Sequence, residues 1–425
     1  MSAGHFSRLR TRNAGKGLIA VLLLTLFLGA AGLLGRDQLA ARAAAAQQAR
    51  SIAALAMARE ALLGYSISYA ETHSAFDPES GADSSQDYGY LPCPDRENTG
   101  STSPGACGAR DLAAFGRFPW RTVALPDLLD GANECLWYGV AGSIKNNPKA
   151  LHLNWDSPGH FELLAANGAT LPVAAADGLA VAVLIAPGPA LAHQTRSAGD
   201  GPCRGATIAA SDLAAFVDST PGSLAHTIQL RQGLSGSMEG NDLLAWIGVD
   251  DVFDALRRRS DFAAYIDAIG ERAAAALASL LEDTDFVAAH STPVSGVLRT
   301  GALPSAAALG IHTLPRAHDN WRPQFALALC SAGDACIQVD HHADGGSSVS
   351  QFCRAALLFG GERIRDGAAR QLRIGSSAHA QPTQFFEGGN DLHLQLGTPR
   401  FAGADRFRVA NPAYPASADV VRCLS

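Results

Sequence analysis

The chain has 425 residues, of which 47% are hydrophobic and 17% charged, and its formal net charge is -7. This length suits one large domain or two or three smaller ones. The acidic balance provides no basic footprint for nucleic acid and argues against a nucleic-acid-binding class. The charge is uneven, however, because residues 1–16 carry three arginines, one lysine and no acid.

The first predicted element is a continuous helix from Lys16 to about Ala70. It opens with an uncharged run, Gly17–Gly35, whose length is close to that needed to span the hydrocarbon core of a bilayer. A basic segment before an apolar run keeps the N-terminus cytoplasmic and sends the remainder across the membrane. We therefore assign residues 1–16 to a basic cytoplasmic leader, 17–35 to a transmembrane segment and 36–70 to a helical stalk.

A cleaved secretory signal is the alternative reading of this segment, with cleavage near the small residues Ala30-Ala31-Gly32. The alanine-rich pattern continues past that point without proline, and alanine has the highest helix propensity. The uninterrupted helical pattern favours an anchor over a cleaved signal.

All eight cysteines follow the apolar run, and their even number fits pairing in an oxidising compartment. Cys93 and Cys107 flank a turn-rich loop that cannot build its own core, so a local disulfide is expected there. Cys330 and Cys336 close a second small loop. Cys135 with Cys203 and Cys353 with Cys423 are the remaining candidate pairs among the many that eight cysteines allow. Scattered reduced thiols are the alternative.

No motif in the chain points to catalysis or to a resident metal. Cys330, Cys336 and Cys353 with the intervening His341 and His342 are zinc-ligand types, but an oxidising setting favours disulfides. The acids in the loop between Cys93 and Cys107 lack calcium-loop spacing. Nucleophile elbows, phosphate loops and HExxH are absent from the sequence. We expect no catalytic residue, no metal site and no cofactor, and therefore no enzyme.

Beyond the stalk, the pattern predicts a mixture of strands and helices. A strand is expected at Glu134–Val140, and buried strands are expected within the apolar runs 179–191 and 353–364. Residues 249–283 have mostly helical apolar spacing. These elements predict an α+β fold: a long N-terminal helix, then a disulfide-stapled, sheet-containing exported head with an additional helical segment.

The two apolar runs are followed by similar sequences, which suggests an approximate internal repeat. In each, a strand precedes an arginine-bearing loop and a Glu-Gly segment with an Asn-Asp turn, SMEGND at 237–242 and FFEGGND at 385–391. Chance similarity in a Gly- and Ala-rich chain is the alternative. We therefore divide the head into a first sheet region at 71–245, a helical region at 246–320 and a second sheet region at 321–425.

The first 145 residues of the chain resemble a known family, and the rest resembles it only loosely. The segments GYLPCPD, GRFPWRTVALPDLLDG and ECLWYGVAGS, after a basic leader and an apolar helix, resemble a large-headed group of type IV pilins and type II secretion pseudopilins. The resemblance implies that a prepilin peptidase cuts after Gly15, leaving Lys16 as the new N-terminus. Lys16 replaces the family's usual aromatic residue or methionine, and Ala20 replaces its usual acid.

The resemblance also implies a function. The expected protein is a membrane-anchored structural subunit or accessory protein of a type IV pilus or type II secretion-like assembly, acting by helix bundling and by presenting its head. It would cross the bacterial inner membrane once, with the head periplasmic or extracellular. Its expected partners are that membrane, other pilin-like or secretion-system subunits and a prepilin peptidase. A signal-anchored periplasmic binding or surface module is the alternative, followed by an exported enzyme.

Overall fold

The computed structural model describes most of the chain after the leader. The described residues are 14–73, 87–196, 203, 212–219, 224, 227–234, 240–342, 348–374, 381–408, 415 and 418–425, with the side chains of 14–18, 28–37 and 212 excepted. Most of the predicted leader, 1–16, therefore lies outside the described residues.

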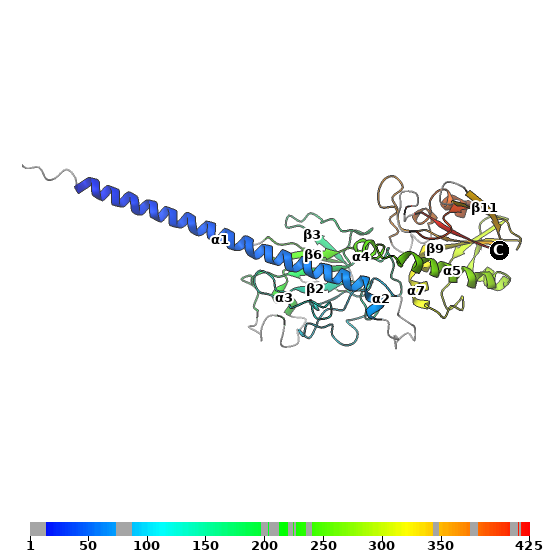
Figure 1. Ribbon diagram of the computed structural model, residues 1–425, viewed down its shortest axis with the longest axis horizontal. Helices are drawn as coiled ribbons and strands as arrows, with labels where there is room; N and C mark the ends of the chain where they lie inside the picture. The colour runs from blue at the N-terminus through cyan, green and yellow to red at the C-terminus, as the bar shows by residue number, and fades with distance from the viewer. Residues whose placement is uncertain are drawn as a thin grey trace, which may run out of the picture.

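The N-terminal helix α1 (Ala14–Ile67) has 54 residues and is followed by the short α2 (Tyr69–Thr72). At 1.5 Å per residue, α1 is about 80 Å long, and its N-terminal part projects from one end of the folded body (Figure 1). These bounds match the predicted helix from Lys16 to about Ala70. Among the described residues, no helix contains an apolar stretch sufficient to cross a membrane.

The C-terminal third of α1 packs against the first sheet rather than forming a free stalk. Its buried residues recur at helical spacing and form one face: Ser51, Ala54, Leu55, Ala58, Leu62 and Leu63. The sheet is antiparallel with the order β1 (Ala114–Arg117), β2 (Trp137–Val140), β4 (Ala182–Ala186) and β6 (Leu243–Ile247). The helix contacts β4 and β6, so the predicted stalk is partly a core element.

Polar contacts fix α1 in this position. Arg59 donates from Nε to the carbonyl oxygen of Trp246 at 2.9 Å and pairs with Asp251 at 3.0 Å. The backbone of Gly131 lies so close that a Cβ there would be 2.0 Å from the carbonyl oxygen of Gln47. Only glycine permits this approach of the loop to the helix.

A second antiparallel sheet lies at the other end of the body. Its order is β14 (Val420–Leu424), β12 (Ala355–Phe359), β9 (Phe325–Cys330), β8 (Leu298–Ala302) and β7 (Thr292–Pro293). Helix α5 (Phe262–Leu280) packs on β12 and β14, as α1 does on the first sheet. The remaining helices are α3 (Asp212–Phe216), α4 (Val249–Leu256), α6 (Thr284–His290), α7 (Pro315–Trp321) and α8 (Asn390–Leu396), with short helices at Arg322–Gln324 and Pro382–Gln384.

The two sheets follow one connection scheme, which we describe as two lobes. The first lobe is the C-terminal third of α1 with residues 87–247, and the second is residues 262–425. In chain order, β1, β2, β4 and β6 correspond to β8, β9, β12 and β14. Each lobe also has a small parallel pair placed at the same points in the chain: β3 (Phe161–Leu164) with β5 (Ile228–Arg231), and β10 (Ile337–His342) with β13 (Arg400–Gly403). The second lobe adds β11 (Ser348–Cys353) beside β10.

Two features of the structure add detail to the sequence-based division of the head. The region 246–320, named helical for its pattern at 249–283, also contains β7 and β8, which belong to the second sheet. The strand β8 is short and mostly half-exposed, with only Leu298 fully buried, so it lacks the alternating pattern of a longer strand. In addition, the Asn-Asp of FFEGGND, which was predicted as a turn, begins α8.

All eight cysteines are oxidised in the structure. The four disulfides join Cys93 to Cys107, Cys135 to Cys203, Cys330 to Cys336 and Cys353 to Cys423. These are the pairs favoured on sequence grounds, and the α+β class with disulfide-stapled sheets is confirmed. The first and second bridges lie in the first lobe and the other two in the second lobe, so each lobe is cross-linked within itself.

Candidate functional site

The loop after β4 carries a buried arginine held in a fixed pattern. Gln194 exchanges two hydrogen bonds with Leu191, through its backbone N–H at 2.9 Å and its side-chain oxygen at 3.0 Å. Arg196 follows two residues later and lies 4.8 Å from the ring of Phe216. Its guanidinium donates to Gly188 O at 2.7 Å, Gln194 Oε1 at 2.8 Å, Ala215 O at 3.0 Å and Phe216 O at 3.3 Å.

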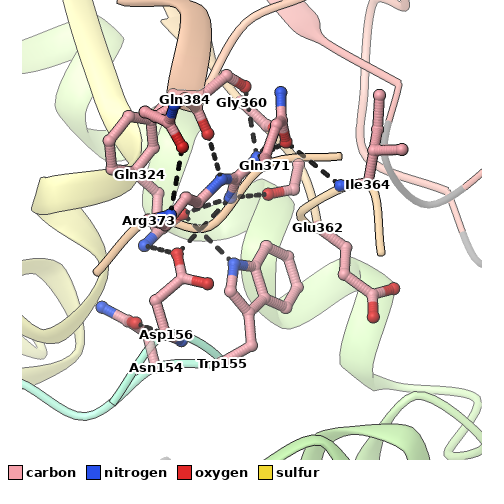
Figure 2. Close-up of polar contacts among 12 residues, drawn as sticks. Asn154, Trp155, Asp156, Gln324, Gly360, Glu362, Ile364, Gln371, Arg373 and Gln384 are labelled. Atoms are coloured by element: carbon pink, nitrogen blue, oxygen red, sulfur yellow. Dashed lines mark hydrogen bonds and ion pairs between the residues drawn. The ribbon is translucent and has the colours of Figure 1, made fainter. Parts of the chain in front are cut away.

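The loop after β12 repeats this pattern around Arg373. Gln371 exchanges the same two hydrogen bonds with Ile364, and Arg373 lies 4.8 Å from the ring of Phe385. Figure 2 shows its guanidinium at the centre of the cluster. It donates to Gly361 O at 2.8 Å, Gln371 Oε1 at 2.8 Å, Gln384 O at 2.7 Å, Phe385 O at 3.2 Å and Gly360 O at 3.0 Å. We call these two constellations the arginine clamps.

The second clamp differs from the first because it also joins the lobes. Arg373 Nη1 lies 2.9 Å from Gln324 Oε1 and 3.5 Å from the carboxylate of Asp156, a residue of the first lobe. Trp155, beside that aspartate, donates to the same Gln324 oxygen at 3.2 Å. The Arg373 side chain is 0% exposed, and burial lowers its pKa while Asp156 acts in the opposite direction. The second clamp is therefore a buried charged contact across the lobe interface.

Each lobe also places buried carboxyl groups beside its clamp. The Asp218 N–H donates to Asp242 Oδ2 at 2.8 Å, and the Glu387 N–H donates to Asp419 Oδ2 at 3.0 Å. Burial, followed by repulsion from Asp218, raises the pKa of Asp242 to about 8. Burial likewise raises the pKa of Glu387 to about 7 and that of Asp419 well above its ordinary value. In the folded chain, these carboxyl groups therefore stay protonated at a higher pH than ordinary carboxyl groups do.

The Asp242→Asn variant is expected to stabilise the chain at alkaline pH. Folded Asp242 keeps a proton that the unfolded chain releases above about pH 4, so wild-type stability falls as pH rises from about 4 to about 8. Asparagine preserves the acceptor for the Asp218 N–H and does not titrate. The melting temperature of Asp242→Asn should exceed that of wild type at pH 8, with the difference narrowing toward pH 4.

Thermal melts between pH 4 and pH 8 test this expectation. Asp366→Asn, at an exposed position, is the matched control and should follow the wild-type curve. Parallel pH curves for wild type and Asp242→Asn would show that this carboxyl does not retain a proton on folding.

Two cavities lie near the second clamp. One, of about 600 Å³, is lined by first-lobe residues such as Asp156 and His160 and by Arg373 of the second lobe. The other, of about 520 Å³, lies mostly in the second lobe and contains Arg322 and Phe385. His152 and Pro323 line both, so the two cavities adjoin. Their volumes are in the range of small-molecule sites.

The structure separates the sequence-predicted sites. Gly15 and Lys16 lie in the first turn of α1, far along the chain from the clamps. His341 and His342 end β10, while the neighbouring cysteines are tied up in disulfides. Within the described ranges, no three His, Cys, Asp or Glu side chains gather as a metal site would require. In the loop after Cys93, Asp95 accepts from backbone N–H groups and forms a turn.

The two arginine clamps were not predicted from the sequence, although both loops contain a shared pattern. Gln194-Thr-Arg196 and Gln371-Leu-Arg373 each follow a buried strand, and aligning the two loops on Gln-x-Arg would have paired them. The carboxyl groups have no comparable signal, because Asp242 and Asp419 match only through their place before the last strand of each lobe.

The comparisons with known proteins give no relative for this arrangement. The chain matches no family model, no curated protein and no solved structure.

Proposed function

We propose that the chain is a membrane-anchored, prepilin-like structural subunit or accessory protein of a type IV pilus or type II secretion-like assembly. The observation that carries this proposal is the division of α1 into two parts. Its C-terminal third is buried in the first lobe, whereas its N-terminal part projects from the body (Figure 1) and exposes large apolar side chains.

The exposed apolar side chains of α1 lie on all sides of the helix. Between residues 19 and 27 they include Ile19, Leu22, Leu23, Leu24, Leu26 and Phe27, each more than half exposed. Nearly consecutive residues of an α-helix cover every direction around its axis. A helix that is apolar all round requires burial in a bilayer or among other helices, and the uncharged sequence of 17–35 extends this character.

This arrangement supports different roles for α1 and for the two lobes. The projecting N-terminal part of α1 would lie in the inner membrane or in a bundle of equivalent helices, with the basic leader on the cytoplasmic side. The two lobes, each cross-linked by its own disulfides, would then lie in the periplasm or outside the cell, where disulfides persist. The heads would face partner subunits.

Processing at Gly15 provides the direct test. Wild type and a Gly15→Leu variant are each expressed with a prepilin peptidase, and their intact masses are compared. We expect wild type to lose residues 1–15 and Gly15→Leu to remain whole. Gly17→Leu, just beyond the cut, is the matched control and should be processed.

Two other outcomes of the mass measurement would contradict parts of the proposal. A cut near Ala31 would indicate a secretory signal and overturn the anchor. An intact wild-type chain in the membrane fraction would overturn prepilin-like processing and favour a signal-anchored binding or surface module.

A further inference from the structure

The cavity of about 520 Å³ has largely apolar walls. Phe325 comes from β9, Phe385 and Phe386 follow the short helix at Pro382–Gln384, and Leu394 comes from α8. Thr300 of β8 adds a hydroxyl at the rim. These elements are far apart in sequence and held by the second sheet, so the cavity is a built feature of the lobe.

One guanidinium in this cavity differs from those of the clamp arginines. Arg322 lines the cavity and is partly buried, and its Nε is buried without an acceptor. Across the described residues, no oxygen accepts a hydrogen bond from its side chain or forms an ion pair with it, and the described lining contains no aspartate or glutamate. The clamp arginines, Arg196 and Arg373, are instead fully engaged. Arg322 is therefore a charge without an acidic partner among the described residues.

A partly buried guanidinium without an acidic partner among the described residues can pair with a ligand of opposite charge, and the apolar walls around it strengthen that attraction. The planar guanidinium matches a carboxylate with two parallel hydrogen bonds. One guanidinium balances one negative charge, which favours a monocarboxylate over a phosphate dianion. Two histidines lie near Arg322. His152 lines the cavity and places its Nδ1 2.7 Å from the carbonyl oxygen of Asp319, whereas His318 lies outside the lining and burial lowers its pKa.

We propose that this cavity binds a small monocarboxylate with an apolar body, with the carboxylate on Arg322 and the body against Phe325, Phe385 and Phe386. The volume lies in the range of small-molecule sites. This binding activity is separate from the proposed anchoring through α1 and stands on different residues.

A matched set of probes tests the charge requirement. The detergent-solubilised full chain is titrated with 4-phenylbutyrate, 4-phenylbutanol and 4-phenylbutylamine, and binding is followed by ligand-observed NMR. We expect saturable binding of the acid, with the alcohol and the amine at least tenfold weaker. Equal binding of the acid and the alcohol would overturn the proposal.

Variants then test the residue. Arg322→Met, which keeps the aliphatic stem, should weaken binding of the acid at least tenfold. Arg370→Met, at an exposed position outside the cavity, should leave binding unchanged. Unaltered binding by a folded Arg322→Met variant would overturn the assignment. Ala302→Trp, from an exposed residue of the lining, provides a second route if Arg322→Met does not fold, because it fills the cavity without removing a charge.

The same chemistry could come from the C-terminus of a polypeptide. The acid and amide forms of the peptide acetyl-Gly-Leu-Phe distinguish that source from a free acid. Arg322-dependent binding of the acid form alone supports the carboxylate site and extends it to peptides. Absence of binding by 4-phenylbutyrate and by the peptide acid would overturn the proposal, and neither outcome bears on processing at Gly15.

Discussion

We expect the Arg373→Met variant to lose about 3–5 kcal/mol of its free energy of unfolding, the usual cost of breaking a buried ion pair by removing one partner. The guanidinium is 0% exposed. Its removal leaves Asp156 buried without its nearest cation and strips donors from backbone oxygens on both sides of the loop, including those of Gly361 and Phe385. Buried acceptors left without donors account for much of this cost.

Denaturant unfolding followed by tryptophan fluorescence measures this loss. Trp155 lies beside the second clamp, so its emission reports on the lobe interface. Arg370→Met, three residues earlier on the exposed part of the same loop, is the control and should change stability by less than about 0.5 kcal/mol. A loss of under about 1 kcal/mol for Arg373→Met would mean that the clamp contributes little to folding.

The second large effect is expected from the bridge between Cys353 and Cys423. In the chain-entropy model, its separation of 70 residues corresponds to about 4 kcal/mol, and the separation of 6 residues between Cys330 and Cys336 to about 2 kcal/mol. The longer bridge restricts the unfolded chain more strongly. Replacing both Cys353 and Cys423 with serine should therefore cost more stability than the same change at Cys330 and Cys336.

Unfolding under non-reducing conditions compares the two double-serine variants directly. Both variants remove one bridge from the same lobe and add two hydroxyls. The difference between their losses of stability therefore reflects the number of residues that each bridge encloses. Equal losses, or a larger loss at Cys330 and Cys336, would show that local contacts outweigh the restriction of the unfolded chain.

Local patterns were enough to predict several elements. The uninterrupted helical sequence from Lys16 gave α1, and the valine-rich run at 179–191 contains β4. The short-range pairs Cys93–Cys107 and Cys330–Cys336 followed from the loops they close. In each case the signal lies within a few residues of the element, because propensity and loop closure act locally.

Features set by distant contacts were not predictable in this way. The clamp on Arg373 depends on Asp156 and Gln324, which come from other parts of the chain. The environment of Arg322 likewise depends on the assembled cavity. Asp319 lies only three residues away in the sequence, yet it does not line the cavity. Strand β8 lacks a pattern of its own and is defined by its pairing with β9.

The unequal lengths of the two lobe helices have a consequence for stoichiometry. Helix α1 packs on the sheet of the first lobe and continues far beyond it (Figure 1). Helix α5, which packs on the sheet of the second lobe, has only 19 residues. If chains associate through α1, each place in the helical bundle therefore carries two sheet units. The outer layer of such an assembly would hold twice as many folded units as its centre holds helices, so neighbouring chains would need a wider spacing or a longer axial step than single-lobed subunits of the same helix diameter.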